Sequence, residues 1–217
     1  MIVVIQCAAS KQMNAGNFRT ADGRRVLFVA QPAMAPPSDI THYARPDDLS
    51  DAGSSWREQL MRYNADPQDN PLGLLTAIAL YTHPTYTHLA KKIDADRLFI
   101  LSAGWGLLPA SFLTPNYDIT FSPQAEPYKR RRRMDPYRDF APLADDENAP
   151  MVFFGGKDYV PLFARLTRTH RGPRTVFFNS LLPPDAPGCG LQRFVTTTRT
   201  NWHYECADAW LGQLRPH

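Results

Sequence analysis

The residues with the most evident chemical potential form a short cluster behind a proline in the middle of the chain. Asn116, Tyr117 and Asp118 follow Pro115. An aromatic ring beside an amide and a carboxylate suits a pocket for a flat heterocycle, bound by stacking and edge hydrogen bonds. A carboxylate near a sugar can also stabilise an oxocarbenium-like cation or activate water. The cluster indicates a base pocket with Asp118 as its acid; an Asp118 that merely caps a turn is the equally open alternative.

Two further segments place small and polar residues directly after strand-like runs. Cys7, Ser10 and Lys11 follow the apolar run 2–6, and Gly-Gly-Lys157 follows the run 151–154. Parallel α/β sheets bind ligands beyond the carboxyl ends of their strands. Ser10 and Lys11 are therefore candidates for holding an anion, and a helix start beside Lys157 could hold one phosphate. Plain turns explain both segments as well, because the second lacks the spacing of a phosphate loop.

A run of five cations offers the chain's densest positive charge. It consists of Lys129, Arg130, Arg131, Arg132 and Arg133. Like charges repel, so such a run must be solvated or bound to anions. The planar fork of Arg suits phosphate, and interleaved tyrosines suit unstacked bases. We expect phosphate contact here; the alternative is a solvated loop whose charge the acidic residues 145–147 offset. Arg199 and Asn201, which precede the last helix, are expected to contribute to the same site.

The elements that must position these residues alternate between strands and helices. Apolar or β-branched runs predict strands at 2–6, 26–29, 97–102, 151–154 and 175–178. Capping and periodicity predict helices at 55–64, 71–82, 84–93, 157–169 and 202–214. This alternation predicts an α/β fold with a mostly parallel central sheet flanked by helices, in a single domain spanning 1–217. Residues 31–53 are expected to be a proline-rich loop or flap, and 122–150 an excursion from the core.

Composition narrows the class of protein. The 217 residues include 20 prolines and carry a net charge of only +3, which excludes a globally polycationic nucleic-acid coat but not a local basic cleft. The apolar stretches are too short for a membrane span or a signal-peptide core. Three scattered cysteines do not make a disulfide framework, so we expect a reducing, cytoplasmic setting. No metal-ligand spacing is present, and we expect no metal and no cofactor.

Taken in order, the motifs resemble a known group of proteins. The matching segments are Cys7 to Lys11, Leu80-Tyr81, Leu101-Ser102-Ala103 to Gly106-Leu107-Leu108, Tyr117-Asp118-Ile119-Thr120, and Gly155 to Tyr159. Together they look like the YaaA-like superfamily of bacterial proteins, with the block from Ser102 to Asp118 as the densest match. The resemblance implies an α/β fold, a positively charged cleft and DNA binding. Trp105 departs from the pattern, since a smaller or tyrosine-like residue is expected there.

Antiphage DNA glycosylases that remove glucosylated hydroxymethylcytosine are associated with this resemblance. It thus implies a hydrolase that flips and excises a modified base from double-stranded DNA, with Asp118 and Asn116 as catalytic candidates. A second carboxylate candidate is Asp22. The base-pocket candidates are Cys7, Ser102, Trp105, Tyr117 and Asn201. The phosphate-binding candidates are Ser10, Lys11, Lys129, Arg130, Arg131, Arg132, Arg133, Lys157 and Arg199. The alternatives are a non-catalytic DNA-binding stress protein and an N-glycosidase acting on free nucleosides or nucleotides.

Overall fold

The computed structural model of the protein describes residues 1–66, 69–144 and 148–214, and it has the predicted α/β fold. Its strands are β1 (Ile2–Gln6), β2 (Arg25–Val29), β3 (Thr41–Ala44), β4 (Leu75–Thr76), β5 (Leu98–Ser102), β6 (Gly106–Pro109), β7 (Leu113–Thr114), β8 (Tyr117–Asp118), β9 (Met151–Phe154), β10 (Arg174–Phe178) and β11 (Gly190–Arg193). Its helices are α1 (Trp56–Ala65), α2 (Pro84–Lys92), α3 (Val160–Leu166) and α4 (Trp202–Gln213), with short 3-10 turns η1 (Pro32–Met34), η2 (Ala95–Arg97) and η3 (Pro127–Lys129).

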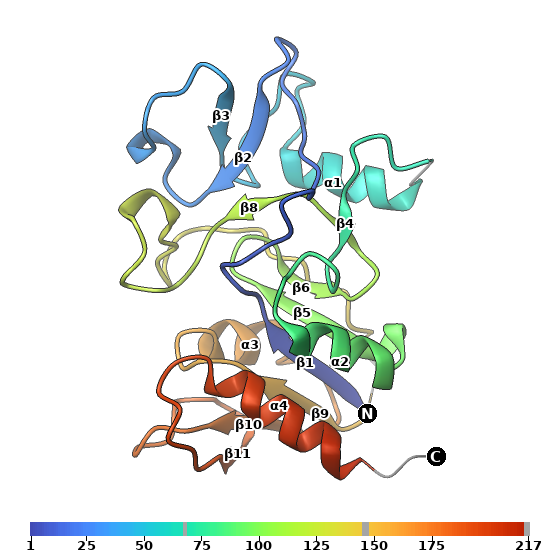
Figure 1. Cartoon of the computed structure of the whole chain (residues 1–217), viewed down its shortest axis with the longest axis vertical. Coiled ribbons are helices and arrows are strands. Elements are labelled where there is room, and N and C mark those ends of the chain that lie inside the picture. The colour runs from blue at the N-terminus through green and yellow to red at the C-terminus, as the bar shows by residue number, and fades with distance from the viewer. Residues whose placement is uncertain (67–68, 145–147, 215–217) are drawn as a thin grey trace.

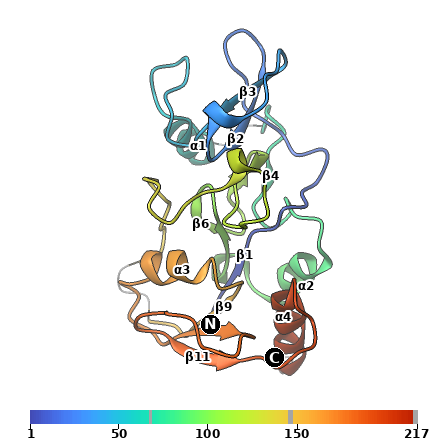
Figure 2. The same ribbon diagram turned by 90° about the vertical axis from the view of Figure 1, so that its left-hand side faces the viewer.

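A six-stranded sheet forms the lower half of the molecule as drawn in Figure 1. Its order is β11-β10-β9-β1-β5-β6, and every neighbouring pair is parallel except β5 with β6. The four residues from Ile2 to Ile5 are buried, as expected for a central strand covered on both faces. Figure 2 shows why: α3 covers one face of the sheet, while α2 and α4 cover the other.

A smaller parallel sheet, in the order β3-β2-β8, lies in the upper half with α1 beside it (Figure 1). Its core is aromatic: Phe28 of β2 contacts Trp56 of α1 and Trp105 of the turn after β5, with ring centroids 6.1 and 4.9 Å apart. All three side chains are almost fully buried. Burial of such large rings stabilises the contact between the two sheets, because apolar area removed from water contributes roughly 25 cal/mol per Å².

Several predicted elements are confirmed. The strands lie where the apolar runs placed them, and α1, α2 and α4 match the predicted helices within two residues. Ser55 caps α1 through a capping box with Glu58, so the N-terminal signal read from the sequence is borne out. The predicted helix 157–169 is real but shorter, since α3 begins at Val160 and ends at Leu166.

The predicted helix at 71–82 is wrong. Asn70 does not start a helix: its side-chain amide accepts from the backbone N–H of Leu74 and donates to the carbonyl of the same residue. This closes a turn in which Asn70 and Gly73 have φ values of 44° and 60°. Local side-chain bonds of Asn to the backbone compete with helix formation. The chain then pairs as β4 with β7 in an antiparallel ladder.

The predicted loop at 31–53 also needs correction. It contains β3, which pairs in parallel with β2 from Thr41 opposite Arg25 to Ala44 opposite Phe28. The β-prone residues Thr41 and Tyr43 pair with the preceding strand β2, and such pairing outweighs the flanking prolines. The acidic residues 145–147, expected to offset the basic run, lie outside the described residues.

Candidate functional site

The sheet topology defines one crevice at the carboxyl edge of the central strands. Within the six-stranded sheet, the next strand along the chain after β1 is β5, which lies on one side of β1. After β9, on the other side of β1, it proceeds to β10 and β11. The loops that leave β1 and β9 therefore diverge, which makes the gap between these strands the topological switch point. Open α/β sheets bind their ligands at such a point, because the diverging loops leave a crevice there.

A cavity of about 540 Å³ occupies this switch point, and we call it the switch-point cleft. Its lining comes from the loops after β1 and β9, the start of α2, residues 120–124 and the start of α4. The lining residues are Gln6, Cys7, Ala8, Ala9, Ser10, Thr82, His83, Pro84, Thr120, Ser122, Pro123, Gln124, Gly156, Asp158, Tyr159, Asn201 and Tyr204. The side chain of Gln6 joins the two strand ends, since its Oε1 accepts a 2.7 Å hydrogen bond from the N–H of Gly156.

A layer of buried tyrosines supports the cleft. The hydroxyl of Tyr117 is 2.8 Å from that of Tyr81 and accepts from the hydroxyl of Ser102 at 2.9 Å. Tyr159, on the cleft wall, contacts the Cys7 sulfur through its hydroxyl at 3.3 Å. Burial raises the pKa of Tyr81, Tyr117 and Tyr159 well above the ordinary value. These hydroxyls therefore stay protonated near neutral pH and act as neutral hydrogen-bonding groups.

A second cavity, of about 350 Å³, adjoins the cleft and shares part of its wall, including Cys7, Thr120 and Tyr159. We call it the Asp118 cavity, because Asp118 lines it together with Lys11 and Lys129. The shared residues place the carboxylate of Asp118 next to the space at the switch point. The two cavities together fall within the size range of small-ligand pockets.

An ion pair anchors Asp118. The ammonium of Lys129 lies 2.7 Å from Oδ2 of Asp118 and 2.6 Å from a carboxylate oxygen of Glu126. Burial disfavours the charge of Lys129, but its hydrogen bonds to the two carboxylates outweigh burial and raise its pKa. Lys129 is thus a firmly protonated partner that anchors the carboxylate of Asp118.

Lys11 has a different environment. It is half-buried, and its ammonium lies over the ring of Tyr117, 4.4 Å from the centroid. Its hydrogen bond is a long one, 3.4 Å to the carbonyl of Ala9. Within the described part of the chain, no carboxylate lies at ion-pair distance from Lys11. Burial lowers the pKa of Lys11, and the opposing influence of Cys7 and, to a smaller extent, Asp118 only partly offsets the effect.

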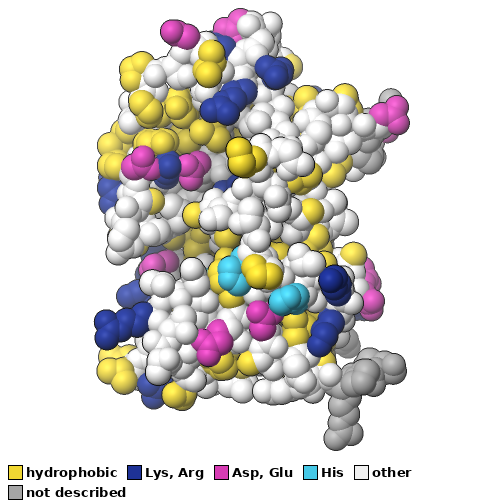
Figure 3. Space-filling view, viewed as in Figure 1, with side chains coloured by type: hydrophobic (Ala, Val, Ile, Leu, Met, Phe, Trp, Pro, Cys, Tyr) yellow, Lys and Arg dark blue, Asp and Glu magenta, His cyan; other side chains and the backbone are white. Residues whose placement is uncertain are grey.

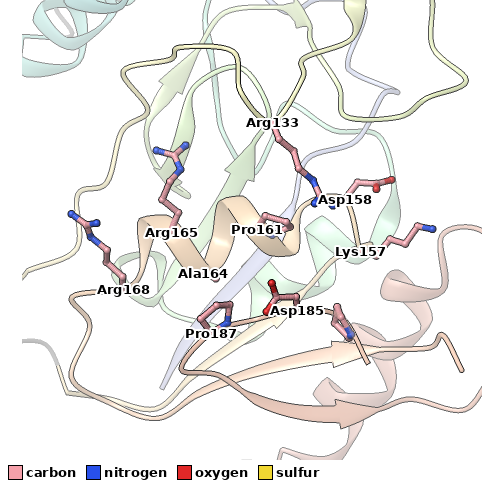
Figure 4. A pocket seen from close by; sticks show the side chains of 10 residues that line it. Arg133, Lys157, Asp158, Pro161, Ala164, Arg165, Arg168, Asp185 and Pro187 are labelled. Atoms are coloured by element: carbon pink, nitrogen blue, oxygen red, sulfur yellow. The ribbon is translucent and has the colours of Figure 1, made fainter. Parts of the chain in front are cut away.

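A basic groove lies beside the cleft. It has a volume of about 680 Å³ and runs along α3, and we call it the arginine groove. Its cations are Arg133, Lys157, Arg165 and Arg168, and its acids are Asp158 and Asp185. Figure 4 shows the basic side chains arranged along α3, with Asp185 and Pro187 on the facing loop. Asp158 lines the groove and the cleft alike, so the two adjoin at this residue.

Positive charge is local rather than global, as the composition predicts. In Figure 3, acidic and basic side chains are interspersed over the face drawn, with dark blue Lys and Arg prominent at the left edge of the lower half. The net charge of +3 is consistent with this distribution. An anionic partner would therefore be attracted to a particular edge and not to the whole surface.

The structure contradicts the base-pocket assignment of Trp105. Its side chain is fully buried, packed between Phe28 and Phe140 at 4.9 and 6.3 Å. The flanking Gly106 has a φ of 92°, and a Cβ there would lie 2.6 Å from the backbone nitrogen of Phe140. Gly104 and Gly106, which flank Trp105, thus allow a tight turn that buries the indole. Trp105 belongs to the core.

Arg131 is also corrected. It is 5% exposed, and its two terminal nitrogens bond both carboxylate oxygens of Asp139 at 2.8 and 2.6 Å. It further donates to the carbonyl of Ala103 at 2.8 Å and stacks on Tyr137 at 3.8 Å. A bidentate, buried guanidinium is not available to phosphate. The residue holds the 131–139 segment against the turn after β5.

The remaining candidates divide by position. Cys7, Ser10 and Asn201 line the cleft, Lys11 and Lys129 line the Asp118 cavity, and Arg133 and Lys157 line the arginine groove. Ser102 and Tyr117 lie beneath the cleft as buried supports, not on its wall. The backbone N–H of Asn116 donates to the carbonyl of Gly16. Asn116, Arg130, Arg132 and Arg199 are not among the lining residues of the three described cavities.

Other residues at the site escaped the sequence analysis. Arg165, in the last turn of α3, and Arg168, which follows the end of that helix, both line the groove. Asp22, the second carboxylate candidate, pairs with Arg24 at 2.8 Å on an exposed loop and does not line these cavities.

Gly155 is a packing residue, since a Cβ there would lie 2.3 Å from the ring of Phe153.

The chain was compared with protein-family models, with curated proteins and with solved structures, and none of the three comparisons found a match. The resemblance to YaaA-like proteins therefore stays a prediction. Within the described residues, no three His, Cys, Asp or Glu side chains come together as a metal site would need. A bilayer-spanning helix, with the necessary length and apolar character, was searched for over the same residues and was not found.

Proposed function

We propose that this protein is a DNA glycosylase-type hydrolase that flips a modified base out of double-stranded DNA and cuts its N-glycosidic bond. Glucosylated hydroxymethylcytosine is the candidate base. The observation that carries the proposal is the position of Asp118: an anchored carboxylate beside a cleft at the topological switch point, with a basic groove leading away from it. A flipped nucleotide needs such a pocket, and the strand that carries it needs cations.

The chemistry that Asp118 supplies follows from its surroundings. N-glycosidic bond cleavage passes through an oxocarbenium-like state in which positive charge develops on the sugar. A carboxylate held by Lys129 in a partly dehydrated cavity stabilises that charge more strongly than one in water. It can equally accept a proton from the attacking water. Gln6 and Tyr159, whose hydroxyl is neutral, line the cleft, and we assign them the hydrogen bonds to the edge of a flipped base.

The arginine groove supports duplex DNA as the partner. The lining of the groove has four cations and two acids, and one of the cations, Arg165, also pairs with Asp139. Each phosphate that such a groove neutralises releases counterions, which favours binding at low salt. Because Asp158 lines both spaces, a strand held in the groove can deliver a flipped nucleotide to the cleft. A small nucleoside would not need these cations, which is why DNA is favoured over a free substrate.

The test is an excision assay on a panel of duplexes, each with one modified cytosine. Protein and DNA are incubated, alkali is added, and strand scission reports an abasic site. Wild-type protein is expected to cut at the modified position, and Asp118→Asn to lose about 10²- to 10⁴-fold in rate while still binding DNA. Asp22→Asn is the matched control, because that carboxylate lies on an exposed loop paired with Arg24.

Each alternative predicts a different outcome of the same panel. Salt-sensitive DNA binding without any abasic product would support a non-catalytic DNA-binding protein and contradict the proposal. Cleavage of free nucleosides without affinity for duplex DNA would support a small-molecule N-glycosidase instead. Full activity of Asp118→Asn would remove this carboxylate from the mechanism.

A further inference from the structure

We infer that Lys11 is a nucleophile whose ε-amine forms an imine with C1′ of a deoxyribose, so that the site acts on the abasic sugar as well as on the base. This inference rests on the proposed function for its substrate class, since it needs a deoxyribose in the Asp118 cavity. It replaces the phosphate-holding role expected for Lys11 from the sequence. The resulting activity is covalent processing of an aldehyde, for which base release alone has no need.

The geometry sets Lys11 apart from the other lysines at the site. Its ammonium lines the Asp118 cavity and lies over the face of Tyr117 at 4.4 Å. By contrast, Lys129 lines the same cavity with both of its carboxylate partners within 2.7 Å. Lys157 is exposed on the arginine groove. Only the lysine without a close carboxylate combines burial with access to the space beside Asp118.

The protonation state follows from the same surroundings. Burial lowers the pKa of Lys11 because the ammonium loses hydration, and the nearby Cys7 and Asp118 offset only part of that effect. A lysine desolvated in this way spends more time as the free amine, which is the nucleophilic form. The pKa of Lys129 is raised instead, so that lysine stays an ammonium.

The covalent step balances without an outside oxidant or reductant. The lone pair of Nζ attacks C1′ of the open-chain sugar aldehyde, and the electron pair of the C1′=O bond moves to its oxygen. Asp118 relays the two N–H protons to that oxygen, which leaves as water and gives the imine. Addition of water reverses these steps, releases the C1′ aldehyde and regenerates the amine.

The experiment traps the imine on DNA that already contains an abasic site. Wild-type protein is incubated with an abasic duplex and sodium cyanoborohydride, which reduces an imine to a stable secondary amine. We expect a protein–DNA band on a denaturing gel, and peptide mapping of the adduct is expected to locate it on Lys11. Because the base is already absent, the outcome does not depend on base excision.

Three variants sharpen the result. Lys11→Ala and Lys11→Arg are both expected to lose the band, although Lys11→Arg keeps the positive charge and so retains DNA binding. Lys91→Ala, which removes an exposed lysine in the last turn of α2, is expected to trap like the wild type. Thermal unfolding of each variant checks that it is folded.

Two outcomes would overturn the inference. The first is no band with the folded wild-type protein. The second is an adduct that maps to another lysine or persists in Lys11→Arg. Failure of the proposed function is distinguishable from both, since it shows as lack of base release from an intact modified duplex whatever the abasic DNA does.

Discussion

Two regions of the molecule bury a cation beside the carboxyl end of β5, and they do so in opposite ways. In the first, which we call the arginine hub, Arg57 and Arg131 bind the carbonyls of residues 103–105 and pair with Asp47 and Asp139. In the Asp118 cavity, Lys11 lies on an aromatic ring with a single long hydrogen bond. The hub pairs each of its cations with a carboxylate, whereas the cavity leaves Lys11 without one at ion-pair distance.

The contrast separates structural from functional charge. A buried ion pair holds segments of the chain together. Removing one of its partners destabilises the fold, because the other charge is left buried without a counter-charge. A buried cation without a close partner destabilises the fold, and such a group persists where function requires it. The sequence presents both kinds as basic residues in polar segments. Their surroundings, and not their type, indicate which one can do chemistry.

The largest effect on stability is expected in the hub. Arg131→Ala removes the bidentate partner of the fully buried Asp139 carboxylate and leaves it paired with the exposed Arg165 alone. We expect the free energy of unfolding to fall by about 3 kcal/mol, the lower end of the range for broken buried pairs. Chemical denaturation measures it, with the exposed neighbour Arg132→Ala as the control. A loss in Arg131→Ala no larger than that of the control would erase the distinction drawn between hub and cavity.

The next effect concerns His203, on the first turn of α4 near the cleft. Burial and the neighbouring His83 lower its pKa to about 4. The unfolded chain therefore binds a proton that the folded chain does not, between the ordinary histidine pKa and about 4, and stability falls as pH falls through that window. Between about pH 7.5 and pH 5 this histidine is expected to cost about 2 kcal/mol.

Urea denaturation at the two pH values tests this expectation by comparing wild type with His203→Phe. The variant should lose less stability on acidification by about that amount, whatever its stability at the higher pH. Parallel behaviour of the two proteins would show that His203 does not titrate as its burial implies.

A smaller effect of opposite sign is expected at Lys11. Because burial lowers its pKa, holding the ammonium in the fold costs free energy at every pH below that lowered value. Lys11→Met keeps the aliphatic stem and removes the charge, so we expect the free energy of unfolding to rise by about 0.5–2 kcal/mol. A gain in stability on substitution is typical of residues that are kept for function. A fall in stability would mean that Lys11 is a structural cation like Arg131.

The smallest effect on stability is expected at the arginine groove, where a substitution should change the affinity for DNA instead. Arg168 is exposed, so Arg168→Ala should leave the free energy of unfolding within about 0.5 kcal/mol of wild type. Its affinity for DNA should decline, and the salt dependence of binding should decrease by about one unit of slope. Fluorescence anisotropy over a range of salt measures this. Arg193→Ala, at the exposed edge strand β11, is the control, and an equal decline there would deny the groove a specific role.

Sequence patterns were enough for the elements whose signals are local. Apolar runs located β1, β5, β9 and β10 of the main sheet but not β6 or β11, and the cap at Ser55 located α1. Cys7 and Ser10 could be placed at a ligand edge because they directly follow a strand. Long-range pairing was beyond such patterns: β2 lies between β3 and β8, which are separated by more than seventy residues in sequence.

The candidate site was harder to predict than the fold, for the same reason. Arg131 looks like its neighbours in a run of cations, and only the approach of Asp139 and the carbonyl of Ala103 makes it structural. Trp105 looks like a presented aromatic until Phe28 packs on it from another sheet. In both cases the deciding contact comes from tertiary structure, which residue type and spacing do not encode.

The central claim is that the space beside Asp118 is where an N-glycosidic bond is cut. Its most direct test is single-turnover release of the free base from a duplex with one glucosylated hydroxymethylcytosine, followed by mass spectrometry. We predict one free base per abasic site with the wild-type protein, and base release that is lost in Asp118→Asn while DNA binding persists. Release at the same rate by Asp118→Asn, or tight binding of the duplex by the wild type with no free base, would contradict the account.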